Sequence, residues 1–153
     1  YDIAPHNAPV EAGYEIWHAI QGGPALVPDM RLAEEFFVLT DKSGKIISES
    51  ASSLSRYPRT LLGIKENQVY FVIATTEHPL SLPEAAQVLR DAGFEKAMAF
   101  DGGGSVSLDY RDENIHVISD KDQTARKLKS FFIITKDNTV DLSKEKPKYI
   151  LVQ

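Results

Sequence analysis

The sequence predicts an α/β or α+β domain that contains a mixed β-sheet and few helices. Three observations lead to this fold class: a length of 153 residues, many short segments rich in strand-forming residues, and one segment with clear helical periodicity. Hydrophobic residues make up 42% of the chain and charged residues 25%, as is typical of globular proteins. A chain of this size can enclose one hydrophobic core, so we expect a single domain over residues 1–153.

The strand candidates are short β-branched, aromatic and aliphatic segments, separated by turns such as Asp41–Gly44 and Glu66–Asn67. A further turn at 111–114 has a strand pattern on each side, which predicts a hairpin. Ser48–Ser55 is polar and rich in serine, so we expect a loop there. The expected strands lie at residues 14–20, 35–40, 45–47, 59–64, 69–75, 97–100, 106–110, 115–119, 128–135 and 150–152.

The clearest helix begins after Ser81. Ser81 and Glu84 have the spacing of a capping box, and Pro83 falls in the first turn, where its missing N–H does no harm. Gly93 is placed to end the helix. Apolar residues at helical spacing share one face: Leu82, Ala85, Ala86, Leu89 and Ala92.

This helix lies between the strand candidates 69–75 and 97–100, which predicts one βαβ unit with two parallel strands. The second strand ends at Asp101-Gly102-Gly103-Gly104-Ser105. Open α/β sheets bind their ligands at the carboxyl ends of strands. The sequence therefore predicts a ligand-binding loop at the end of the βαβ unit.

Three consecutive glycines are costly to order, and a folded domain tolerates them where the backbone turns sharply or approaches another group closely. Successive N–H groups in such a turn, here those of Gly102–Gly104, can bind an anion. A carboxylate beside a bound phosphate would repel it, so Asp101 should act on a different atom. Asp101 could serve as a nucleophile, a general base, an acceptor for a sugar hydroxyl or a metal ligand. The alternative is a tight turn without a ligand.

Two arginines and a glycine pair are further candidates for ligand contacts. Arg59 opens a strand after Pro58, and Arg126 precedes another strand; an arginine so placed can bind a phosphate through two N–H groups. A surface arginine at a strand end is the alternative for each. The backbone of Gln21-Gly22-Gly23-Pro24 could approach a ligand, although an ordinary turn explains the same residues.

Composition excludes several classes of function. The net charge of −5 argues against nucleic acid as the main partner, because phosphate backbones are bound by clustered Lys and Arg. No cysteine is present, which rules out disulfides, thiolate zinc sites and a cysteine nucleophile. No apolar run is long enough to span a bilayer. The four histidines lack metal-binding helical spacing, so neither a metal site nor a cofactor is predicted.

Taken in order, these segments resemble the phosphodiester glycosidase domain family. The family carries Gly-Pro-x-Leu-Val, Arg-Thr-x-x-Gly-Ile, a Ser-Leu helix start, Ala-x-x-x-Asp-Gly-Gly-Gly-Ser and a late arginine before an apolar strand. The matching segments here are Gly23–Val27, Arg59–Ile64, Ser81–Leu82, Ala97–Ser105 and Arg126. Two departures are Val106, where a small residue is usual, and the missing Asn-Gly turn upstream. The second departure leaves open that the domain lacks an upstream segment.

The resemblance implies hydrolysis of a sugar-1-phosphodiester, in a secreted or periplasmic setting such as a bacterial envelope that handles exopolysaccharide. The substrate would be a sugar phosphate or polysaccharide. Asp101 would be nucleophile or base, with Arg59 and Ser105 as catalytic partners. Substrate would be bound by Gly102, Gly103, Gly104, Arg126, Gln21 and Gly23.

Two other functions stay open. A carbohydrate- or phosphosugar-binding module of the cell envelope would use the same loop without catalysis. A metal-dependent phosphodiesterase would use Asp101 as a ligand for a divalent cation, with Asp109, Asp112 or Glu113 as the nearest further carboxylates.

Overall fold

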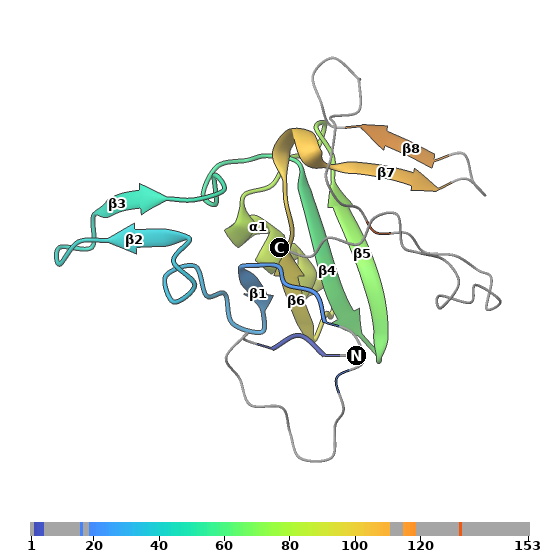
Figure 1. The fold of residues 1–153 in the computed structure, drawn as a ribbon, viewed down its shortest axis with the longest axis horizontal. Helices are drawn as coiled ribbons and strands as arrows, with labels where there is room; N and C mark the ends of the chain where they lie inside the picture. Colours follow the sequence, from blue (N-terminus) through green and yellow to red (C-terminus); the bar gives the residue numbers. More distant parts are fainter. Residues whose placement is uncertain (1, 5–15, 17–18, 111–114, 119–131, 133–153) are drawn as a thin grey trace.

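The computed structural model describes residues 2–4, 16, 19–110, 115–118 and 132 (Figure 1). Within them, one α-helix and a short 3₁₀ turn accompany a four-stranded sheet and two separate hairpins. This arrangement confirms the α+β class with few helices. The elements are β1 (Ala25–Val27), β2 (Val38–Thr40), β3 (Ile46–Glu49), β4 (Arg59–Lys65), β5 (Gln68–Ala74), α1 (Leu82–Asp91), β6 (Lys96–Ala99), η1 (Gly103–Ser105), β7 (Ser107–Tyr110) and β8 (Ile115–Ile118).

The main sheet has the strand order β1-β6-β4-β5, so β6 lies between β1 and β4 (Figure 1). The predicted βαβ unit is present as β5, α1 and β6. Its two strands run in the same direction because both are antiparallel to β4. However, β4 lies between them, and every described strand pairing is antiparallel rather than mixed as predicted.

A tight hairpin explains why β4 separates the two strands. Glu66 and Asn67 connect β4 to β5 with φ values of 50° and 58°. Positive φ at both central residues is typical of the type I′ turn, which brings two antiparallel strands side by side. β4 is thereby paired with β5 on one edge, and β6 adds to its other edge.

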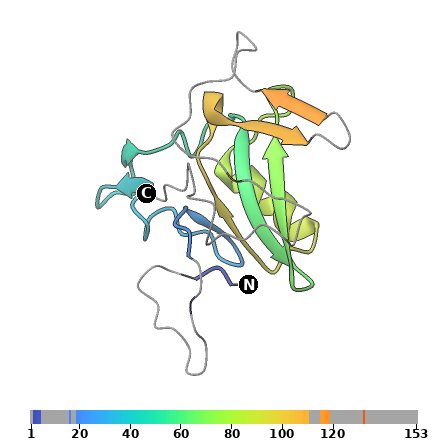
Figure 2. The same ribbon diagram turned by 45° about the vertical axis from the view of Figure 1, so that its right-hand side comes forward.

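The hydrophobic core lies between the sheet and α1, which covers one face (Figure 2). The apolar helix face is buried as predicted, except that Ala92 at its end is exposed. The residues buried between the two layers include Leu26, Leu61, Leu82, Ala85, Ala86, Leu89, Ala97 and Ala99. Close packing of small alanines on both layers brings the helix near β6, and so holds the strand that carries the glycine loop.

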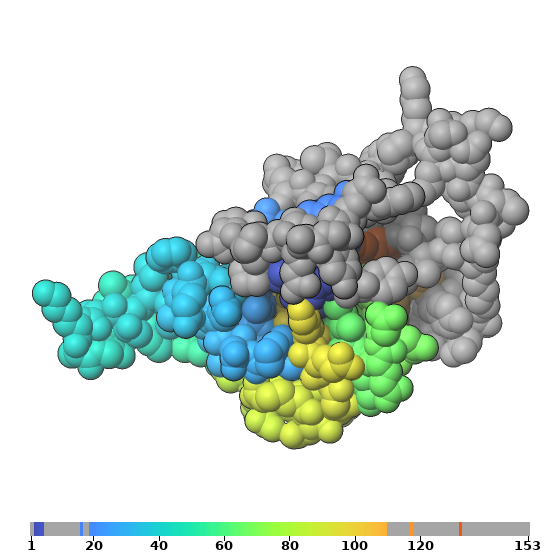
Figure 3. All heavy atoms as spheres, turned by 90° about the horizontal axis from the view of Figure 1, so that it is seen from below, coloured from blue at the N-terminus to red at the C-terminus, as the bar shows by residue number. Residues whose placement is uncertain are grey.

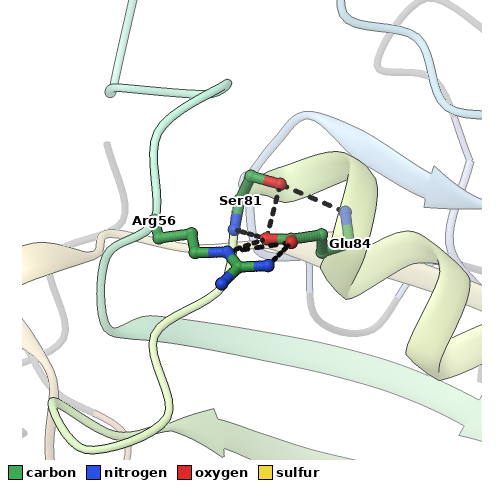
Figure 4. Close-up of polar contacts among 3 residues, drawn as sticks. All are labelled: Arg56, Ser81 and Glu84. Carbon is green, nitrogen blue, oxygen red and sulfur yellow. Dashed lines mark hydrogen bonds and ion pairs between the residues drawn. The ribbon is translucent and has the colours of Figure 1, made fainter.

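The predicted capping box at the start of α1 is confirmed (Figure 4). The Ser81 Oγ accepts a hydrogen bond from the Glu84 N–H at 3.3 Å, and the Glu84 carboxylate accepts one from the Ser81 N–H at 2.9 Å. Arg56 donates to both oxygens of the same carboxylate. These bonds, with Arg56 contributing most, lower the pKa of Glu84 from its ordinary value of 4.5 to about 2.

Most other strand predictions agree with the structure to within a few residues. β1 was not predicted, because the Gly-Pro turn before it indicated a break and the strand is only three residues long. Ile16, Ala19 and Ile20 belong to no strand, contrary to prediction. The strands predicted at 128–135 and 150–152 lie outside the described residues, apart from Phe132.

The β2–β3 hairpin projects from the body of the domain (Figure 3). All four residues of β3 are exposed, and Val38 is the only half-buried residue of β2. No helix in the described part of the chain is long and apolar enough to cross a membrane.

Replacing Glu84 with Gln should weaken the acid dependence of stability. Because the folded-state pKa of Glu84 is depressed, its carboxylate stabilises the fold above pH 4.5, and this contribution is lost as the pH falls towards 2. Urea unfolding at about pH 7 and pH 2.5 would measure the effect. The loss of unfolding free energy in Glu84→Gln should be larger at pH 7, and an equal loss at both pH values would contradict the prediction.

Candidate functional site

Three of the predicted motifs meet at one end of the main sheet. The Gly23 N–H donates to the Ala99 carbonyl at 2.8 Å, which places the start of β1 beside the end of β6. On the other side of β6, the Phe100 N–H donates to the Thr60 carbonyl at 2.8 Å. The glycine loop therefore leaves the sheet between the Gly23 turn and the beginning of β4. The sequence order alone did not imply this convergence, because β1 and β4 precede β6 by many residues.

Each of the first two glycines of the loop has its own structural reason. A Cβ atom at Gly102 would lie 3.0 Å from the Pro58 carbonyl oxygen and 3.5 Å from Nη1 of Arg59. Gly103 has φ +63°, a left-handed conformation that costs most other residues about 1–2 kcal/mol. Close approach and backbone curvature thus explain two glycines without a ligand.

The loop N–H groups are largely used within the protein. Gly102 donates to the Asp101 Oδ1 at 3.0 Å, and Gly103 donates to the Pro58 carbonyl at 2.9 Å. The Ser105 N–H donates to Gly102 within the 3₁₀ turn. Among the described residues, the Gly104 N–H and the Ser105 hydroxyl have no hydrogen-bond partner. The loop therefore offers an anion fewer backbone donors than the three that the sequence suggested.

Arg59 is the most buried charged residue of this region, with a relative exposure of 3%. Its guanidinium donates four hydrogen bonds, and each ends on a backbone carbonyl. Burial lowers the pKa of Arg59 from its ordinary value, while the nearby Glu49 carboxylate opposes the shift. An arginine is so basic that it remains charged under these conditions. The role of Arg59 as a direct phosphate ligand would require it to release some of these bonds, and it stays a prediction.

Asp101 is exposed at the point where the chain leaves β6. Its Oδ1 accepts the hydrogen bond from the N–H of Gly102, which orients the carboxylate at the base of the loop. The side chain is accessible to a substrate and directly precedes the glycine loop in the chain. Asp101 is thus the exposed group of the candidate site, and the half-buried Gly104 and Ser105 add polar groups without a hydrogen-bond partner among the described residues.

Two further residues were predicted to bind substrate, Gln21 and Arg126, and the structure describes Gln21 but not Arg126. Gln21 is exposed two residues before Gly23, and its predicted contact with substrate stays a prediction. Arg126 lies outside the described residues, so its predicted role in substrate binding stays a prediction.

One carboxylate near this sheet end was missed by the sequence analysis. The sequence pattern predicts a strand that starts at Glu35, but the strand β2 starts at Val38, and the Glu35 carboxylate accepts hydrogen bonds from the Ala25 N–H at 3.1 and 3.3 Å. A Cβ atom at Gly23 would lie 3.0 Å from Oε2 of Glu35. Glu35 therefore fixes the outer edge of β1 beside the Gly23 turn. No local signal identifies it, since the two partners are ten residues apart.

Metal binding gains no support from the described residues, which contain no group of three or more His, Asp or Glu side chains placed to hold an ion. Asp109 lies in β7, while Asp112 and Glu113 are outside the described residues. An apolar hollow of about 240 Å³ lies between α1 and β5. None of the predicted site residues lines it.

These features define a small α+β domain whose candidate site is a glycine loop with an exposed carboxylate at the end of a central strand. The family model described as phosphodiester glycosidase matches residues 3–135. The chain belongs to the phosphodiester glycosidase family, as the resemblance in the sequence predicted. No match was found among curated proteins or among solved structures.

Substitutions at Gly102 and Gly103 should distinguish the close approach of the backbone at Gly102 from the left-handed conformation at Gly103. Gly102→Ala forces a methyl group towards the Pro58 carbonyl, so we expect a loss of about 1–3 kcal/mol in unfolding free energy. Gly103→Asn should cost less than about 1 kcal/mol, because asparagine tolerates a left-handed conformation and a Cβ atom there meets nothing within 4 Å. Urea unfolding would measure both. A Gly102→Ala loss no greater than that of Gly103→Asn would contradict the close approach.

Proposed function

We propose that this protein hydrolyses a sugar-1-phosphodiester and releases the sugar from its phosphate-linked partner. Membership of the phosphodiester glycosidase family supports the reaction class. The observation that carries the proposal is the exposed Asp101 carboxylate, oriented by the Gly102 N–H at the start of a loop in which the Gly104 N–H and the Ser105 hydroxyl have no partner among the described residues.

The proposed reaction needs little or no protonation of the leaving group. The bond between the anomeric carbon and the phosphate oxygen breaks, and its electron pair stays on that oxygen. The product is a phosphate monoester, whose second pKa is about 6, so it leaves as a stable anion near neutral pH. Ordinary glycosidases need one carboxylic acid to protonate a poor leaving group and a second carboxylate. Here one carboxylate can suffice.

Asp101 can act either as a general base or as a nucleophile, and the reaction balances in both cases. As a base, it takes a proton from a water molecule whose oxygen bonds to the anomeric carbon. As a nucleophile, it bonds to that carbon itself, and water then hydrolyses the resulting sugar ester. In either case the groups that we propose to bind the departing phosphate are the Gly104 N–H and the Ser105 hydroxyl, with the buried Arg59 cation close to Gly102 of the same loop.

Asp101→Asn should abolish the reaction while leaving the fold intact. The amide oxygen can still accept the Gly102 hydrogen bond, but it can neither attack the sugar nor take a proton efficiently. We expect a rate at least about 100-fold lower, as is usual for loss of a general base. Release of reducing sugar and phosphate monoester from a panel of sugar-1-phosphate methyl diesters would measure it, with unfolding free energy as the fold control.

Asp29→Asn is the matched control, since Asp29 is exposed and follows β1 at the opposite end of the sheet. Its turnover should equal that of the unmodified chain. Unchanged turnover in Asp101→Asn would contradict the catalytic role. If the unmodified chain binds sugar phosphates but hydrolyses none, the protein is instead a binding module.

A further inference from the structure

Arg59 lies against the glycine loop of the candidate site and connects two other segments of the chain. Its Nη1 donates to the Ala51 carbonyl at 3.0 Å, and its Nη2 donates to the carbonyls of Ser52 and Ser55 at 2.7 and 2.8 Å. Its Nε donates to the Leu80 carbonyl at 2.9 Å, just before the N-cap of α1. One side chain therefore holds the 51–55 turn against the segment that leads into the helix.

The 51–55 turn is built to present its carbonyl oxygens to this guanidinium. Ala51 and Ser52 have φ values of 53° and 47°, which are unfavourable for residues other than glycine. The fully buried Ser53 donates its hydroxyl to the Ser50 carbonyl at 2.6 Å, and its own carbonyl accepts from the Leu82 N–H at 2.8 Å. The strained turn is thus kept in place from within by Ser53, by α1 and by Arg59.

The other side of the guanidinium faces the glycine loop. The position of a Cβ atom on Gly102 is 3.5 Å from Nη1 and 3.6 Å from Cδ of Arg59. The neighbouring Gly103 N–H donates to the carbonyl of Pro58, the residue before Arg59. The loop therefore rests directly on the Arg59 side chain and its backbone.

The donor count leaves the guanidinium little capacity to bind a ligand. A guanidinium has five N–H donors, and four of those of Arg59 are already used. A two-pronged contact with phosphate needs two free donors on one edge. The ion pairs among the described side chains are Arg56–Glu84 and Lys96–Asp2, so no described carboxylate neutralises Arg59 directly.

We propose that Arg59 is a positioning residue, which holds the 51–55 turn and the glycine loop in the geometry that Asp101 requires. It acts through Gly102 and Pro58, and its positive charge, which forms no direct ion pair among the described side chains, favours an anion above the loop without touching it. As regards catalysis, this inference rests on the proposed function. The positioning itself is a property of the structure and can be tested without turnover.

Arg59→Lys is the informative variant because it keeps the positive charge but removes the planar set of guanidinium N–H donors. A lysine ammonium cannot reach four carbonyls that lie around a guanidinium. We expect faster amide hydrogen exchange at Gly103, Ser105 and Val106, with exchange unchanged at Ala85 in α1 and at Ala92, the C-cap of α1. On a sugar-1-phosphate methyl diester, kcat should fall by about 100-fold, as expected for a small displacement of a catalytic group, with KM changed by less than about 3-fold.

Arg56→Lys is the matched control, because the exposed Arg56 borders the same turn but, among the described residues, binds the half-buried Glu84 carboxylate rather than the turn. It should leave exchange in the glycine loop and kcat unchanged. Ser53→Ala offers a second route if Arg59→Lys does not fold, since it removes the Ser53–Ser50 hydrogen bond from within the turn. It should also accelerate exchange at Gly103 and Val106.

The outcomes separate this inference from the proposed function. A raised KM in Arg59→Lys, with kcat and loop exchange unchanged, would overturn the inference and make Arg59 a direct phosphate ligand. Unchanged loop exchange in Ser53→Ala would overturn it as well. If the unmodified chain hydrolyses no phosphodiester, the proposed function fails, but accelerated loop exchange in Arg59→Lys still supports the positioning role.

Discussion

The geometry of the candidate site depends on one buried cation, the guanidinium of Arg59. Removing an arginine from water costs several kcal/mol, and hydrogen bonds from a charged donor contribute about 1.5–3 kcal/mol each. Four bonds to carbonyls are therefore of the size needed to offset burial. Because those carbonyls belong to a turn and to the segment before α1, the cation orders backbone that has no regular structure of its own. The glycine loop then rests on the same side chain.

The rest of the architecture presents Arg59 at the required position. The two-residue turn at Glu66–Asn67 fixes β4 as the partner of β5, and the remaining edge of β4 receives β6. The start of β4 and the end of β6 consequently lie side by side. Arg59 is the first residue of β4 and Asp101 follows Phe100 after β6, so strand pairing alone brings the cation beneath the loop.

Local signals in the sequence were sufficient for the helix and for most strands, but not for the site. The capping box of Ser81 and Glu84 and the β4–β5 turn each depend on residues a few positions apart, so their patterns are readable. Arg59 was recognised as important, yet its bond to Leu80 spans 21 residues and no spacing rule predicts it. The strand order was not predicted for the same reason: helical periodicity predicts a crossover, but not which strand lies between its two ends.

The glycine triplet shows how structural and functional explanations coexist in one motif. Gly102 is needed because the loop approaches Pro58 and Arg59, and Gly103 because the chain turns through a left-handed conformation. The N–H groups of Gly102 and Gly103 bind within the protein, which leaves that of Gly104 for an anion. The path of the chain as it leaves β6 is fixed in this way, and the Asp101 carboxylate before the loop is exposed. A carboxylate next to an anion is electrostatically unfavourable, and a buried cation beneath both is the arrangement that reduces this repulsion.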